Sequence, residues 1–169
     1  MILMVYQNVV KGLENLHIFL EWYKDKKLGI VFVGEAWIEK NGRGAQSHPS
    51  FAHISVVKKR RRVMVYTRKG LESKINIVNE EDNYVTIQEK NKGKCIEVYM
   101  NRKIQVERWK SWLGRLEEEM GRDSSILVDW NAYSYSWYKA KEQDGRGKMM
   151  VECMTGTGWM VMEGDSGPM

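Results

Sequence analysis

Side chains that carry oxygen ligands stand where three apolar segments of the sequence end. Asn8 follows the segment ILMVYQ, and Glu35 follows LGIVFVG. Asp129 comes directly after ILV, and Asn131 stands two positions further on. Ligand sites in α/β sheets gather outside the carboxyl ends of strands, so these side chains are expected to converge. A few hard oxygen donors predict a Mg²⁺ or Mn²⁺ site that keeps water or substrate phosphate oxygens as its other ligands.

A simpler interpretation of the same residues stays open. One acidic residue at the end of a strand is usually only a solvated terminus. Three such ends in one chain weaken that interpretation without excluding it. Asp129 and Asn131 lie two positions apart, so both would project from one side if the strand continues through them.

The periodicity of the apolar residues predicts the helices that must position these ends. In residues 12–27 and again in 104–120, apolar side chains recur at steps of three and four, which is helical spacing. Gly121 is a plausible stop for the second helix. A third, short helix is expected over residues 147–155.

Short runs of β-branched and aromatic residues predict the strands. Five of them, between residues 53 and 100, lie about ten residues apart and suit an antiparallel meander. The order of helices and strands favours an α/β fold, an (α+β) four-layer sandwich in which two mostly antiparallel sheets are stacked inside and helices cover them. The expected strands are residues 2–6, 28–33, 53–57, 63–67, 75–78, 84–90, 95–100, 126–128 and 159–163.

The length and composition of the chain limit the classes of protein to which it can belong. The 169 residues suit a single domain, residues 1–169, large enough to bury a sizeable core. No apolar run approaches the ~20 residues of a membrane span, and two cysteines without metal spacing indicate a reduced, intracellular protein, nuclear or cytoplasmic. The net charge of +5 fits a polyanionic partner but does not identify one.

Four segments together carry a family resemblance. They are QNV near the start, GEAWI (34–38), VYMN (98–101) and ILVDWNAYSYSW (126–137). In this order they resemble the endonuclease/exonuclease/phosphatase family, in particular its non-LTR retrotransposon endonuclease branch. The segment DGRGKMMVECMTGTGWMVMEGDSGPM (144–169) is similar to the same branch, so the resemblance covers almost the whole chain.

The resemblance implies roles for the residues at the strand ends. Glu35 would be the principal metal ligand, with Asn8 beside it, and Asp129 would position or activate the attacking water. Asn131 would hold the scissile phosphate, and Tyr99 would contact it. The implied reaction is hydrolytic cutting of DNA, with a reverse transcriptase domain elsewhere in a longer parent protein.

Three further residues are candidates for substrate binding. The resemblance implies that Trp137 packs under the site. Tyr133 lies in an aromatic loop that could stack on bases, although loop aromatics pack locally at least as often. Arg62 closes the run KKRRR (58–62), which suits phosphate binding, a nuclear signal or a solvated hairpin.

The activity that we expect depends on the positions at which this sequence differs from the family pattern. Ala36 stands where the family usually has Pro, and the chain ends where the family continues into a Ser-Asp-His motif and its last strands. None of His17, His48 and His53 matches that motif. We therefore expect a weak or inactive Mg²⁺-dependent endonuclease, or alternatively a non-catalytic remnant that only binds nucleic acid.

Overall fold

The computed structural model describes nine stretches of the chain, residues 3–8, 13–35, 47–55, 62–81, 84–90, 93–99, 104–121, 124–129 and 142–160. They form two compact units, of which the first holds all the strands and helix α1, and the second holds helices α2 and α3. The helices are α1 (Leu13–Tyr23), α2 (Val106–Glu119) and α3 (Gly145–Thr157), and a 3₁₀ turn, η1, spans Glu72–Lys74. The strands are β1 (Leu3–Asn8), β2 (Leu28–Gly34), β3 (Phe51–His53), β4 (Val63–Arg68), β5 (Ile75–Glu80), β6 (Tyr84–Glu89), β7 (Lys94–Tyr99) and β8 (Ser125–Asp129).

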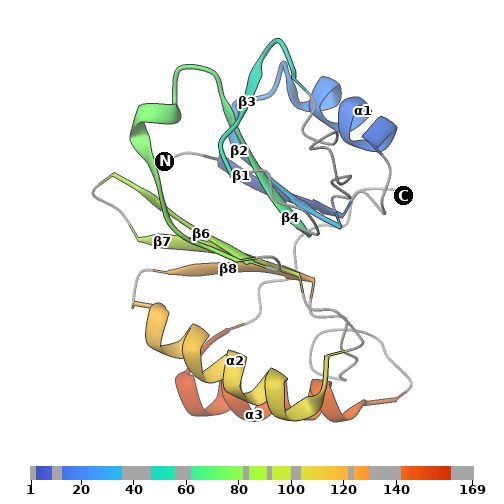
Figure 1. Cartoon of the computed structure of the whole chain (residues 1–169), viewed down its shortest axis with the longest axis vertical. Coiled ribbons are helices and arrows are strands. Elements are labelled where there is room, and N and C mark those ends of the chain that lie inside the picture. The colour runs from blue at the N-terminus through green and yellow to red at the C-terminus, as the bar shows by residue number, and fades with distance from the viewer. Residues whose placement is uncertain are drawn as a thin grey trace. The chain divides into compact units, whose positions relative to one another are not determined.

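The strands of the first unit form two sheets of four, in the orders β1-β2-β4-β3 and β5-β6-β7-β8 (Figure 1). In each sheet one edge pair is parallel, β1 with β2 and β7 with β8, and the other pairs are antiparallel. The expected mixed α/β sandwich with mostly antiparallel sheets is therefore confirmed. The two sheets also share one plan, a parallel edge pair followed by antiparallel neighbours.

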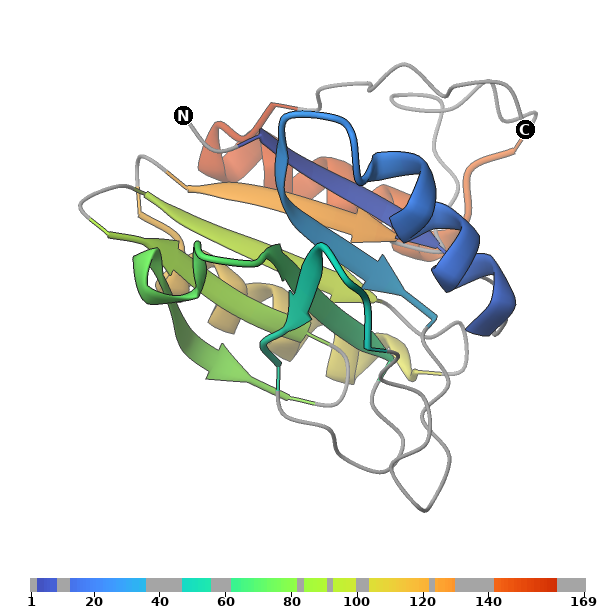
Figure 2. The same ribbon diagram turned by 90° about the horizontal axis from the view of Figure 1, so that it is seen from above.

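Two hydrophobic clusters hold this unit together. One lies between α1 and the β1–β4 sheet, and it includes Leu16 and Leu20 of the helix with Val31 and Val33 of β2. The other lies between the two sheets, where Ile30 and Phe32 of β2 are joined by residues from β4, β6 and β7. The strand β2 is buried along its whole length, which explains why its sequence is a continuous apolar run. Figure 2 shows α1 lying across the outer face of the first sheet.

The predicted five-strand meander is wrong, because the chain changes sheets inside it. Strands β3 and β4 pair in one sheet, whereas β5, β6 and β7 form the antiparallel part of the other. The change occurs after β4, where Gly70 adopts a φ of 90° and the turn η1 follows. A positive φ is readily available to glycine and redirects the chain, but an isolated glycine in the sequence does not say which sheet the next strand joins.

Several boundaries differ from the predicted ones for local reasons. Strand β3 ends at His53 instead of residue 57, because the Ser55 hydroxyl accepts the Val65 amide at 3.0 Å in place of a strand partner. Helix α3 begins earlier than expected, since the Asp144 carboxylate caps it by accepting the amide of Gly147 at 2.7 Å. It ends at Gly158 with a φ of 73°, and Trp159 and Met160 lie in no strand. The remainder of the expected strand 159–163 falls outside the described residues.

Helix α1 ends at Tyr23, four residues before the predicted end, and Arg68 of β4 stabilises the turn that follows. Its Nε donates to the Leu28 carbonyl at 2.9 Å, and Nη1 and Nη2 donate to the Lys24 carbonyl at 3.1 Å. The guanidinium also lies 5.3 Å from the centre of the Phe51 ring. One side chain therefore holds the α1–β2 turn against the sheet.

Replacing Arg68 by Met is expected to lower the free energy of unfolding by about 1–3 kcal/mol, because charged hydrogen bonds to several carbonyls are lost together. Urea unfolding measures the change, and Lys69→Met is the control, since Lys69 is an exposed neighbour. An Arg68→Met protein as stable as the Lys69→Met protein would contradict this account of the turn.

Within the ranges that the structure describes, no helix is both long and apolar enough to cross a membrane.

Candidate functional site

The parallel edge pair of each sheet ends in residues that the sequence singled out. At the end of β1, Asn8 is paired in register with Gly34, the last residue of β2. At the end of β7, Tyr99 is paired with Asp129, the last residue of β8. Because parallel strands end at the same edge of a sheet, the first sheet places Asn8 beside the residue before Glu35, and the second places Tyr99 beside Asp129.

One hydrogen bond connects the two sheet ends. The Tyr99 hydroxyl donates to Glu35 Oε1 at 2.7 Å, although the two residues are 64 positions apart in the sequence. Glu35 directly follows Gly34, so a continuous path runs from Asn8 through Glu35 and Tyr99 to the backbone of Asp129. The structure thus brings together residues from four strand ends that are distant in the sequence.

The backbone of Glu35 is in an unusual conformation. Its φ is 54°, in the left-handed region that non-glycine residues seldom adopt. Such a conformation costs of order 1–3 kcal/mol and persists only where the surroundings hold it. Glu35 is half-buried, and its bond to Tyr99 is one of the contacts that hold it.

Tyr6 makes a close contact with Gly34, directly before Glu35, and the sequence interpretation did not identify this contact. A Cβ atom placed on Gly34 would lie 2.1 Å from Tyr6 Oη and 2.8 Å from Tyr6 Cζ. The tyrosine ring therefore rests against the bare α-carbon of Gly34, directly before Glu35, where only glycine fits. Tyr6 lies two positions before Asn8, so strand alternation could have placed the two on one face, but a close approach to a glycine leaves no sequence pattern.

Arg62 lies at the same end of the first sheet. It directly precedes Val63, and Val63 is paired in register with Gly34. The backbone of Arg62 is therefore beside that of the Gly34–Glu35 step, and its side chain is half-buried. The remaining part of the KKRRR run, residues 58–61, lies outside the described residues.

The other candidate positions are described only in part or not at all. For Asp129 the structure describes the backbone pairing with Tyr99. Asn131, Tyr133 and Trp137 lie outside the described residues. Their roles stay predictions.

The three histidines serve other parts of the fold. His48 is buried, with Nε2 3.0 Å from Glu21 Oε1 and Nδ1 accepting the Ser50 amide at 3.1 Å. Glu21 is also bound by Lys24, and this hydrogen bond lowers the pKa of the Glu21 carboxyl below its ordinary value. His53 Nε2 lies 2.7 Å from the Ser55 hydroxyl.

His17 is exposed on α1, its ring centre 5.9 Å from that of His48. His53 also packs against Tyr66 of β4, with ring centres 5.1 Å apart, so these histidine contacts involve α1, β3, β4 and the residues flanking β3.

Among the side chains described at the joined sheet ends, Glu35 supplies a carboxylate, and Asn8 and Tyr99 supply neutral oxygens. Among the side chains that the structure describes, no three His, Cys, Asp or Glu groups gather closely enough to enclose a metal. The Glu35 carboxylate accepts the hydrogen bond from Tyr99 with one oxygen, and its remaining lone pairs are available to a metal ion. One carboxylate with neutral oxygen donors fits Mg²⁺, which needs few protein ligands, better than a metal that requires an all-protein shell.

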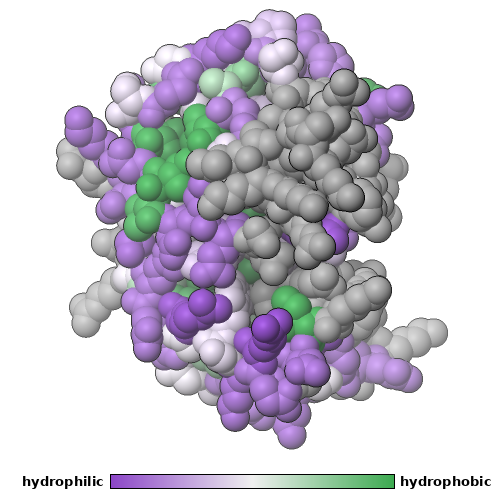
Figure 3. Space-filling view, in the orientation of Figure 1, coloured by the Kyte–Doolittle hydropathy of each residue, from purple (hydrophilic) through white to green (hydrophobic). Residues whose placement is uncertain are grey.

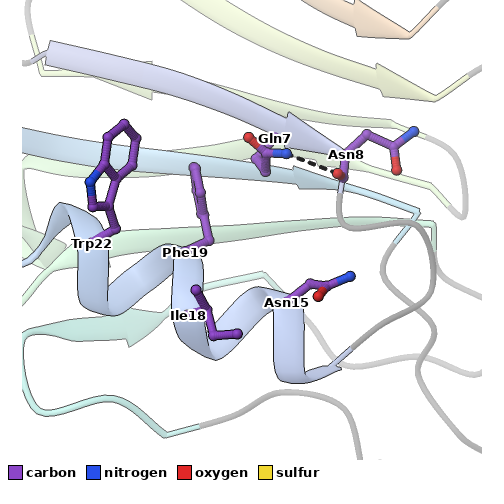
Figure 4. Close-up of a pocket in the computed structure, with 6 residues that line it drawn as sticks. All are labelled: Gln7, Asn8, Asn15, Ile18, Phe19 and Trp22. Carbon is purple, nitrogen blue, oxygen red and sulfur yellow. Dashed lines mark hydrogen bonds between the residues drawn. The ribbon is translucent and has the colours of Figure 1, made fainter. Parts of the chain in front are cut away.

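A cavity of about 280 Å³ opens beside the end of β1 (Figure 4). Gln7 and Asn8 line it from the strand, and Asn15, Ile18, Phe19 and Trp22 line it from α1. The Gln7 side-chain amide donates to the Asn8 carbonyl at 3.0 Å. Asn8 therefore belongs both to this cavity and to the joined strand ends.

Searches of family models and of curated protein sequences find no match. Similar proteins are found by comparison with solved structures. The endonuclease domain of TRAS1, a telomere-specific non-LTR retrotransposon, superposes with a TM-score of 0.72 at 16% identity, covering 96% of this chain and 74% of that one. An AP endonuclease from Archaeoglobus fulgidus superposes with a TM-score of 0.61 at 14% identity, covering 92% and 70%. At these identities the likeness is one of fold, and the fold is the one that the sequence motifs predicted. The chain shares the fold of these two endonucleases.

Proposed function

We propose that this chain is a retrotransposon-type endonuclease domain that hydrolyses DNA phosphodiester bonds slowly with the help of Mg²⁺ or Mn²⁺. The observation that carries the proposal is the Tyr99–Glu35 hydrogen bond, which joins the carboxyl ends of the two sheets. The fold shared with the TRAS1 endonuclease domain supports it. DNA is the proposed partner, and a longer parent protein with a reverse transcriptase domain is the proposed context.

Glu35 and Asn8 are the proposed metal ligands. The left-handed backbone of Glu35 and its bond to Tyr99 fix the carboxylate beside the end of β1, where Asn8 is paired with Gly34. A bound Mg²⁺ would supply a Lewis acid for the phosphoryl oxygen and for the developing alkoxide.

The other residues act on the phosphate and on water in this proposal. Tyr99 contacts a phosphate oxygen next to Glu35 while its hydroxyl continues to donate to Glu35, and Asn131 holds the scissile phosphate with its amide. Asp129 orients the attacking water. Arg62, Tyr133 and Trp137 bind or support the DNA strand, with Arg62 supplying positive charge beside Glu35.

The rate is expected to be low because none of His17, His48 and His53 matches the Ser-Asp-His motif of the family. A carboxylate alone is a weak base for water at neutral pH, and well-placed general bases contribute about 10²–10⁴-fold. His48 contacts Glu21, and His53 contacts Ser55 and Tyr66. The same observation favours a second candidate function, a non-catalytic domain that binds nucleic acid.

A plasmid-nicking assay with Mg²⁺ distinguishes these candidates. We expect slow nicking that Asp129→Ala abolishes and that Asp25→Ala, a change at an exposed acidic residue after α1, leaves intact. Equal nicking by wild type and Asp129→Ala would point to a contaminating nuclease and contradict the proposal. DNA binding that weakens with salt, together with no nicking, would favour the binding domain.

A further inference from the structure

The cavity beside β1 coincides with an exposed hydrophobic surface. Ile18 and Trp22 are 65% and 61% exposed, and both line the cavity. In the part of the molecule that the structure describes, only Val78 and Met160 are other large hydrophobic residues with such exposure. On the face seen in Figure 3, hydrophilic side chains cover most of the described surface. An exposed aromatic and aliphatic pair at a hollow is a typical mark of a binding site.

The polar groups of the cavity are amides. Gln7 comes from β1 and Asn15 from α1, so amide groups stand on two walls of the hollow, whereas the Asn8 side chain points away from α1 (Figure 4). Each amide side chain offers both donors and an acceptor, without a net charge. Such a lining suits a neutral ligand whose edge also carries both donors and acceptors.

The aromatic side chains suit a flat ligand. Phe19 and Trp22 both line the hollow from α1, and the Trp22 indole contacts Lys26 and Tyr23. Lys26 Nζ lies 4.3 Å from the centre of the Trp22 ring, and Tyr23 contacts that ring edge-on with centres 4.8 Å apart. An indole held in this way needs little further ordering to stack on a ligand.

The position of the cavity connects it to the strand ends. Asn8 lines the cavity, and its register partner Gly34 directly precedes Glu35. The hollow and Glu35 therefore both lie at the end of the first sheet where β1 and β2 finish.

We propose that the cavity lined by Gln7, Asn8, Asn15, Ile18, Phe19 and Trp22 binds an unpaired nucleobase of the DNA strand that is held at Glu35. This inference rests on the proposed function and adds a subsite to it. Trp22 stacks on the base, and the amides of Gln7 and Asn15 contact its edge. A nucleobase can stack on the flat indole and can also form hydrogen bonds with the amide donors and acceptors. An aliphatic side chain of a protein partner cannot do both.

Binding of labelled single-stranded DNA, measured by fluorescence anisotropy in the presence of Mg²⁺, tests the subsite. The two probes are an oligothymidine and an abasic strand of equal length, which carries the same phosphates without bases. We expect wild type to prefer oligothymidine and Trp22→Ala to lose about 5- to 150-fold in affinity for it, the range contributed by one stacked base. The abasic strand should bind both proteins equally.

Two variants control this experiment. Val78→Ala removes an exposed hydrophobic side chain from β5 and should leave both affinities unchanged, while Trp22→Phe should keep most of the preference. Equal binding of oligothymidine by wild type and Trp22→Ala would overturn the subsite and leave the proposed nuclease standing. Equal losses on both strands would overturn it as well. If wild type bound neither strand and did not nick plasmid, both the subsite and the proposed function would be wrong.

Discussion

Glu35→Gln is expected to lower the affinity for Mn²⁺ at least about 100-fold and to remove any Mg²⁺-dependent nicking. Changes to groups that only support a metal ligand already cost about 10–100-fold, so removing the charge of the principal ligand should cost more. Glutamine keeps the shape of the side chain and can still accept the Tyr99 hydroxyl proton, so the contact at 2.7 Å can persist. The variant therefore tests the charge and leaves the fold intact. Calorimetric titration with Mn²⁺ measures the affinity.

Glu81→Gln is the matched control. Glu81 also accepts a tyrosine hydroxyl, that of Tyr84 at 3.2 Å, but it follows β5 and is exposed. We expect this protein to bind Mn²⁺ as wild type does. Unchanged affinity in Glu35→Gln would show that the metal, if bound at all, is held elsewhere.

Gly34→Ala is expected to lower the free energy of unfolding by about 1–3 kcal/mol, the usual cost of an added methyl group in a packed site. The new Cβ would stand 2.1 Å from Tyr6 Oη and 2.8 Å from Cζ, so the whole ring must move and not only its tip. Because Gly34 directly precedes Glu35, the displacement should also weaken Mn²⁺ binding. Urea unfolding and the same titration measure the two effects.

A double-mutant cycle separates this contact from a general effect of alanine. Tyr6→Leu in the Gly34→Ala background should recover part of the lost stability, since it removes the clashing ring. Gly114→Ala is the control, because no atom lies within 4 Å of its added Cβ and an alanine inside helix α2 should stabilise by roughly 0.5–1 kcal/mol. A Gly34→Ala protein as stable as wild type would refute the close contact of Tyr6 with this glycine.

The sequence predicted the elements better than their arrangement. A continuous apolar run marked β2, and three- and four-residue spacing marked α1 and α2, because burial imposes these patterns directly on the chain. The division of β3 to β7 between two sheets was not predictable in this way. Strands of either sheet bury the same kinds of residue, so composition does not distinguish them.

The same distinction applies to the candidate site, where the sequence indicated the residues but not the contacts between them. Asn8 and Glu35 stood out because polar residues close apolar strands, and Tyr99 entered through the family resemblance. The hydrogen bond between Tyr99 and Glu35, and the contact of Tyr6 with Gly34, depend on how the two sheets stack and how β1 lies beside β2. Contacts of that kind arise from tertiary packing between distant residues, and no local spacing encodes them.

Paramagnetic broadening by Mn²⁺ in an amide NMR spectrum tests the convergence of the strand ends most directly. The account predicts that the amide signals of Asn8, Glu35 and Tyr99 broaden together at the lowest Mn²⁺ concentrations. Those of Leu28 and Lys94, which begin β2 and β7 and lie about 20 Å and 16 Å along the strands from their ends, should stay sharp. Broadening at the end of one sheet only, or first at the acidic run 117–119 of α2, would contradict a shared metal site.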